Sequence, residues 1–114
     1  MIEDLSTKSK SGDAMGKDFE TIKKMLENLK DYIRKEYRAE IIGIFGSYAR
    51  GEQKETSDLD ILVEFEESAG IGLLKFINLE NYLSDLLEIK VDLVMKSALK
   101  PRIGKHILKE TVYL

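Results

Sequence analysis

Apolar residues recur along the chain with two spacings, and each spacing predicts one kind of element. Between residues 18 and 37 they fall three and four positions apart, which predicts an amphipathic helix with charged residues on its outer face. Asp18 is a suitable N-cap for this helix. A second helix is predicted from about Ile71 to Leu87. Pro101 suits the first turn of a last short helix, whose apolar face continues at steps of four with Ile103, Ile107 and Thr111.

Three short segments rich in β-branched residues predict strands, at Glu40–Phe45, Leu59–Phe65 and Ile89–Met95. Because side chains alternate across a strand, Asp58 and Asp60 lie on the face opposite the apolar residues of the second strand. The resulting order αβ(α)βαβα predicts an α/β (α+β) fold, with a small mixed sheet of three to four strands covered by helices on one side.

The first 16 residues are polar, contain Ser-Gly and lack apolar periodicity, which predicts a flexible leader before one domain at 17–114. Met15 is an alternative natural start. A chain of 114 residues can bury one apolar core but is too short for two domains. One site should therefore explain the function.

Composition limits the locations, metal ligands and binding partners that the chain can have. No apolar run approaches the roughly 20 residues that cross a bilayer, and the N-terminus lacks a signal-peptide core, so we expect a cytoplasmic protein without membrane contact. There is no cysteine, so a metal would be held by oxygen ligands or the single histidine, a set that suits Mg²⁺. The net charge of −3 argues against general nucleic-acid binding, although residues 96–109 contain five basic and no acidic residues.

Carboxylates gather on two predicted strands. Asp58 and Asp60 are two positions apart, which places their Cα atoms about 6.5 to 7 Å apart on one face of a strand. Their carboxylates could hold one cation, or a pair of Mg²⁺ ions as in phosphoryl transfer. Asp92 would complete a triad if the third strand pairs beside the second. Flanked by Val91 and Leu93, it would be costly to bury without a cation or hydrogen-bond donors.

The turn after the first strand offers groups that bind phosphate. Gly46 lets the backbone approach a phosphate closely, and Ser47 adds a hydroxyl donor at the start of a short helix. Arg50 and Lys54 could neutralise the charge of a departing pyrophosphate. Turn and carboxylates together predict a site for Mg²⁺ and a nucleoside triphosphate.

These motifs resemble a known family. Gly46-Ser47, ten further residues and Asp58-x-Asp60 match the signature of the DNA polymerase β-like nucleotidyltransferases. The segments Ile44–Glu52 and Ser57–Val63 resemble the minimal nucleotidyltransferases (MNT) of that superfamily, and the resemblance extends over most of the chain from Phe19. It implies the polymerase β-like fold.

The resemblance also implies roles and a partner. Asp58 and Asp60 would be ligands of two Mg²⁺ ions, and Asp92 the third carboxylate, which helps to activate the attacking hydroxyl. MNT proteins similar to this chain are typically antitoxins that attach AMP from ATP to a tyrosine of a HEPN-domain RNase toxin. We therefore expect a hetero-oligomer with such a toxin. The shortness of the chain agrees, because little remains to form an acceptor pocket.

Other interpretations stay open. The chain could be an antitoxin that neutralises by binding alone with a vestigial site, or a nucleotidyltransferase acting on a small molecule or RNA. Arg102 and Lys105 could meet nucleotide phosphates or an acidic partner, or belong to a solvated helix face. His106 is expected to have an ordinary surface or packing role, and Tyr48 could pack or stack on a base.

Overall fold

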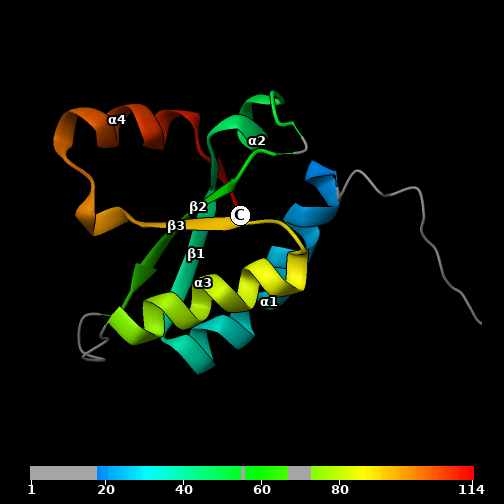
Figure 1. The fold of residues 1–114 in the computed structure, drawn as a ribbon. Coiled ribbons are helices and arrows are strands. Elements are labelled where there is room, and N and C mark those ends of the chain that lie inside the picture. Colours follow the sequence, from blue (N-terminus) through cyan, green and yellow to red (C-terminus); the bar gives the residue numbers. More distant parts are fainter. Residues whose placement is uncertain (1–17, 55, 67–72) are drawn as a thin grey trace, which may run out of the picture.

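The computed structural model describes residues 18–54, 56–66 and 73–114 (Figure 1). The elements in chain order are α1 (Phe19–Tyr37), β1 (Ala39–Phe45), α2 (Ser47–Arg50), β2 (Leu59–Phe65), α3 (Leu73–Leu87), β3 (Val91–Met95), the 3-10 turn η3 (Lys96–Ala98), α4 (Pro101–Glu110) and β4 (Val112–Tyr113). The predicted leader at 1–16 and the predicted helix start at Ile71 lie outside the described residues.

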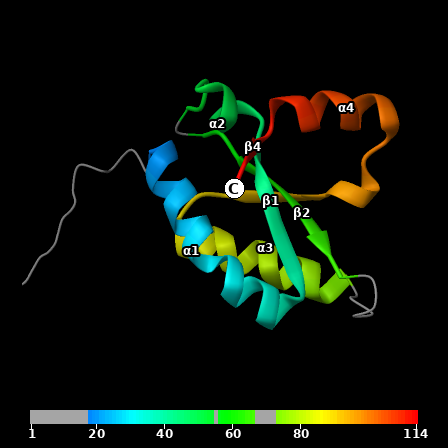
Figure 2. The same ribbon diagram turned by 180° about the vertical axis from the view of Figure 1, so that it is seen from behind.

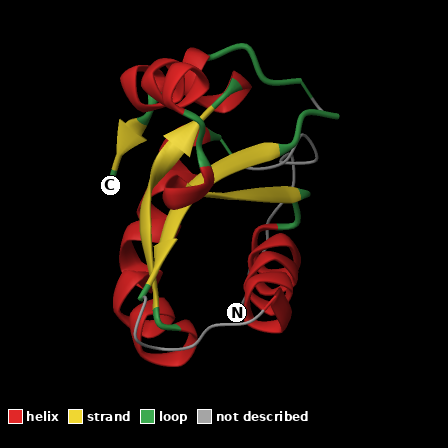
Figure 3. Cartoon of the chain, turned by 90° about the vertical axis from the view of Figure 1, so that its left-hand side faces the viewer, coloured by secondary structure: helices red, strands yellow, loops and turns green. Residues whose placement is uncertain are grey.

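The four strands form one mixed sheet in the order β3-β2-β1-β4, which confirms the predicted α/β architecture. β2 and β3 are parallel, whereas β1 is antiparallel to both β2 and β4 (Figure 3). The register pairs Asp60 with Asp92 across β2 and β3, and Phe45 with Asp60 across β1 and β2. Residues far apart in sequence therefore meet where β1 ends and β2 begins.

One face of the sheet is covered by α1 and α3. In Figures 1 and 2, α1 and α3 lie at the bottom of the molecule, whereas α2 and α4 lie at the top. The Asp18 carboxylate accepts a hydrogen bond from the Thr21 amide at 2.8 Å, which confirms the predicted N-cap of α1. The fully buried core comprises side chains of α1, α3 and the sheet, including Ile22, Leu26, Ile33, Ile41, Ile44, Leu59, Ile61, Val63, Leu79, Leu83 and Leu87.

β3 is an edge strand whose outward amides are bonded to side chains of α3. The Val91 amide donates to Ser84 Oγ and the Leu93 amide donates to Glu80 Oε2, each at 2.9 Å. These bonds satisfy donors that would otherwise remain unpaired at the sheet edge. They also fix the backbone on both sides of Asp92. β3 begins at Val91, two residues after the predicted start at Ile89.

The short strand β4 was not located from the sequence, which predicted no strand after the last helix. That helix ends at Glu110, and Thr111 is a buried cap residue rather than a helical one. β4 can approach β1 closely because Gly43 has no side chain; a Cβ there would meet the Val112 carbonyl and the Thr111 methyl group. Within the described ranges, no helix has the length and hydrophobicity needed to span a membrane.

Candidate active site

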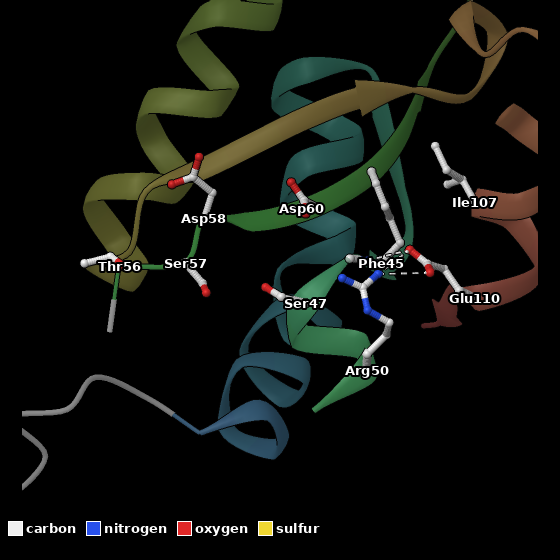
Figure 4. A pocket seen from close by; sticks show the side chains of 10 residues that line it. Phe45, Ser47, Arg50, Thr56, Ser57, Asp58, Asp60, Ile107 and Glu110 are labelled. Carbon is white, nitrogen blue, oxygen red and sulfur yellow. Dashed lines mark hydrogen bonds and ion pairs between the residues drawn. The ribbon is translucent and has the colours of Figure 1, made fainter. Parts of the chain in front are cut away.

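An open cavity of about 490 Å³ lies where β1 ends and β2 begins (Figure 4). Its walls come from the end of β1, the turn into α2, the residues before β2, and the last turns of α4. The lining residues are Phe45, Gly46, Ser47, Arg50, Thr56, Ser57, Asp58, Asp60, Ile107 and Glu110. Five of the seven residues predicted for the site therefore line one cavity.

The glycine turn packs directly against a carboxylate. Gly46 has φ of +80°, a conformation that side-chain-bearing residues rarely adopt, and a Cβ at this position would overlap the Asp60 carboxylate. Gly46 and Ser47 connect β1 to α2, and the antiparallel pairing of β1 with β2 brings Asp60 beside them. The sequence-predicted pairing of turn and carboxylate is thus a direct contact.

Asp60 is a half-buried carboxylate in a negative environment. The pKa of Asp60 is raised from the usual 3.8 to about 6, and the largest cause is burial, because the charged form is poorly solvated. The negative charges of Asp92, Asp58 and Glu110 contribute to this rise, and the positive charge of Arg50 opposes it. A bound cation would relieve both the burial cost and the repulsion.

Asp58 and Asp92 flank Asp60 from different elements. Asp58 directly precedes β2, and its Oδ2 lies 3.8 Å from Lys90 Nζ in a largely exposed ion pair. Asp92 lies on β3 in register with Asp60, and it is exposed. The expected cost of burying Asp92 between apolar neighbours therefore does not arise, because its side chain points away from the core that holds Val91 and Leu93.

Glu110 is a site residue that the sequence interpretation missed. Its Oε2 accepts a hydrogen bond from the Gly46 amide at 3.0 Å, and its two carboxylate oxygens lie 3.1 and 3.3 Å from Arg50 Nη1. Arg50 Nε also donates to Glu52 Oε1 at 2.9 Å. The only signal in the sequence is an acidic residue at the end of a basic helix, and that signal does not identify partners some 60 residues away.

Several other predicted candidates lie elsewhere. The Lys54 side chain does not line the cavity, and Arg102 and Lys105 line a separate depression on the outer face of α4. Tyr48 is buried in the hydrophobic core, so of its two interpretations the structure supports packing. His106 is 80% exposed, as expected for a surface residue, and its Nε2 lies 3.9 Å from Glu110 Oε1.

The donor chemistry around Asp60 fits a divalent cation. Asp58 and Asp60, two positions apart, offer oxygen ligands, and Asp92 lies beside Asp60 on the neighbouring strand. The raised pKa of Asp60 reflects its burial and the negative charges around it. Among residues 18–54, 56–66 and 73–114, no three acidic, histidine or cysteine side chains are grouped as a complete ligand set. Side chains would have to reorient, and substrate phosphates commonly supply the remaining ligands of Mg²⁺.

Comparison with known proteins agrees with this geometry. Residues 22–114 match the model of the nucleotidyltransferase domain family. The chain is 54% identical over 95 residues to protein adenylyltransferase MntA of Thermococcus cleftensis, covering 83% of this chain and 94% of that protein.

Solved structures share the fold. One provisionally named a minimal nucleotidyltransferase superposes with a TM-score of 0.74 at 39% identity, covering 86% of this chain and 97% of the other. A toxin-antitoxin structure with AMP-PNP superposes with a TM-score of 0.63 at 25% identity, covering 81% of this chain and 70% of the other. Family match, fold and the arrangement of turn and carboxylates agree, and the chain is a nucleotidyltransferase belonging to the nucleotidyltransferase domain family.

Proposed function

We propose that this enzyme transfers AMP from ATP to a tyrosine hydroxyl of a partner HEPN-domain RNase toxin, and that it thereby acts as an antitoxin. One observation carries the proposal: the Gly46 turn, Arg50 and the half-buried carboxylate of Asp60 meet in a single cavity. The relative named protein adenylyltransferase MntA and the related toxin-antitoxin structure with AMP-PNP support the substrate class and the partner.

In the proposed reaction, the acceptor oxygen bonds to the α-phosphorus of ATP while the bond from that phosphorus to the pyrophosphate oxygen breaks. The Gly46 amide, the Ser47 hydroxyl and Arg50 would hold and neutralise the phosphates, with Lys54 available from the adjacent loop. Asp58 and Asp60 would hold two Mg²⁺ ions, which supply charge neutralisation at the reacting phosphate when bound. We assign to Asp92 the task of assisting loss of the acceptor proton.

A partner protein is the simplest source of the acceptor. The cavity is open and its walls come from one small domain, so a second protein could bring an acceptor group to Asp60. A tyrosine presented by another protein would complete the site. This arrangement favours a protein acceptor over a small molecule, which would need an enclosing pocket.

The test is transfer of label from α-³²P-ATP to the purified toxin in the presence of Mg²⁺. Labelling should appear on the toxin and disappear when its acceptor tyrosine is changed to phenylalanine. Asp58→Asn and Asp60→Asn should each reduce transfer by at least about 100-fold, since each removes a negatively charged ligand of the Mg²⁺ ions that would neutralise the reacting phosphates. Asp85→Asn, on the exposed surface of α3, is the matched control and should transfer normally.

Two results would overturn the proposal. Normal labelling by both site variants would show that these carboxylates do not carry the reaction. Protection of toxin-producing cells by Asp60→Asn, at the same abundance as the unchanged protein, would instead support neutralisation by binding alone.

A further inference from the structure

The Glu110 carboxylate occupies the groups that the proposed function assigns to phosphate. Its Oε2 accepts the Gly46 amide hydrogen, and both carboxylate oxygens lie within hydrogen-bond distance of Arg50 Nη1. The side chain is only 18% exposed and lines the cavity (Figure 4). An anion is therefore already bound at this turn, and it belongs to the chain itself.

Carboxylate and phosphate compete for the same partners. Both accept hydrogen bonds from backbone amides, and both form paired contacts with a guanidinium group. The Gly46 amide has one hydrogen to donate, so it cannot bond fully to Glu110 and to a phosphate oxygen together. A carboxylate left beside a triphosphate would also repel it. A nucleotide that uses this turn must therefore displace Glu110.

The backbone of Glu110 is held in place, which limits the displacement to its side chain. β4 begins two residues after Glu110 and pairs with β1, and the Leu114 amide donates to the Ile42 carbonyl at 3.0 Å. Between Glu110 and β4, the Thr111 hydroxyl donates back to the Ile107 carbonyl of α4 at 2.6 Å. Rotation of the Glu110 side chain toward His106, one turn earlier in α4, requires none of these bonds to break.

We propose that Glu110 is a built-in competitor of the nucleotide triphosphate, which holds the Gly46 turn and Arg50 until ATP replaces it. This inference rests on the proposed function of the same site. In this role the Glu110 side chain lowers the affinity for nucleotide, and it keeps Arg50 ordered while no nucleotide is bound. The opposite role is a permanent brace, in which Glu110 stays bonded to the turn while nucleotide binds and supports that binding.

The two roles predict opposite changes in affinity. Glu110→Gln removes the charge that competes with phosphate, so the Kd for Mg²⁺ and a non-hydrolysable ATP analogue should fall about 5- to 10-fold in calorimetric titration. Glu52→Gln is the matched control, because it removes the other carboxylate on Arg50 without touching the Gly46 amide. It should change this Kd less than about twofold.

Glu110→Asp separates competition from a general effect of negative charge. It keeps the charge but withdraws the carboxylate by about one bond, ~1.5 Å, so it can no longer reach the Gly46 amide. A competitor predicts tighter nucleotide binding for this variant too, whereas a charge effect alone predicts unchanged affinity. Circular dichroism and thermal unfolding would verify that each variant is folded.

A second readout does not depend on turnover or on metal. Titration with tripolyphosphate alone, followed by the NMR signal of the Gly46 amide, should saturate at lower concentration in Glu110→Gln than in the unchanged protein. Weaker or unchanged binding in Glu110→Gln would overturn the competitor role and leave the proposed function standing. Absence of nucleotide binding by the unchanged protein and every variant would overturn both.

Discussion

The two faces of β2 show how one strand serves stability and chemistry separately. Leu59, Ile61 and Val63 point toward α1 and α3 and are fully buried among apolar side chains. Asp60 points the other way, into a cavity where burial and neighbouring charges raise its pKa to about 6. The alternation of side chains along a strand places these opposite environments one residue apart.

The difference lies in what each face does to the free energy of folding. Burial of apolar side chains on the α1 and α3 face stabilises the fold by about 25 cal/mol per Å² removed from water. On the cavity face, clustered carboxylates and a glycine turn of positive φ destabilise it. Substitutions on the first face should therefore lower stability, whereas some on the second should raise stability while lowering activity.

The largest expected loss of stability is on the core face. Leu83→Ala removes a fully buried side chain from α3 and should lower the free energy of unfolding by about 2 to 5 kcal/mol, measured by urea denaturation. Leu86→Ala, on the same helix but 38% exposed, is the control and should cost less than about 1 kcal/mol. Equal losses would contradict the assignment of this face as the core.

A smaller loss is expected at the glycine turn. Gly46→Ala places a methyl group against the Asp60 carboxylate and also strains a φ of +80°. We expect a loss of about 2 to 3 kcal/mol in unfolding free energy, together with weaker nucleotide binding. Gly51→Ala is a matched control, since it has φ of +71° but open space around its Cβ, and should cost about 1 kcal/mol. If Gly46→Ala and Gly51→Ala changed stability and nucleotide binding by the same amounts, the contact between Gly46 and Asp60 would be shown to be unimportant.

The smallest effect is a gain in stability that depends on pH. Because the folded pKa of Asp60 is raised to about 6 from 3.8, ionisation of Asp60 destabilises the folded state as pH rises through this range. In EDTA, Asp60→Asn should therefore melt about 2 to 5 °C above the unchanged protein at pH 8, and this difference should disappear as pH falls toward 4. Mg²⁺ should narrow the difference at pH 8. A lower melting temperature for Asp60→Asn than for the unchanged protein at pH 8 would contradict the prediction that ionised Asp60 destabilises the folded state.

Periodicity was sufficient to predict most of the fold. The steps of three and four identified α1, and the alternation of apolar residues gave the bounds of β2 as they are observed. β4 was missed because a two-residue strand has too few positions for a period to appear. Its pairing depends on the missing side chain of Gly43, a tertiary effect that no local pattern contains.

The candidate site was predictable where its residues are close in sequence. Gly46, Ser47, Asp58 and Asp60 belong to one recognisable motif, and all four line the cavity. Glu110 could not be predicted, because it reaches the turn only through the packing of α4 and β4 against β1. Arg102 and Lys105 were candidates for contact with phosphates because of their positive charge, but both lie on the outer face of α4.

A crystal structure with Mg²⁺ and a non-hydrolysable ATP analogue would test the central claim most directly, namely that the cavity face of the sheet binds the triphosphate. We predict metal density bonded to Asp58 and Asp60, a phosphate oxygen on the Gly46 amide, and Glu110 rotated away from Arg50. A nucleotide bound elsewhere, or metal density without contact to Asp60, would contradict the account.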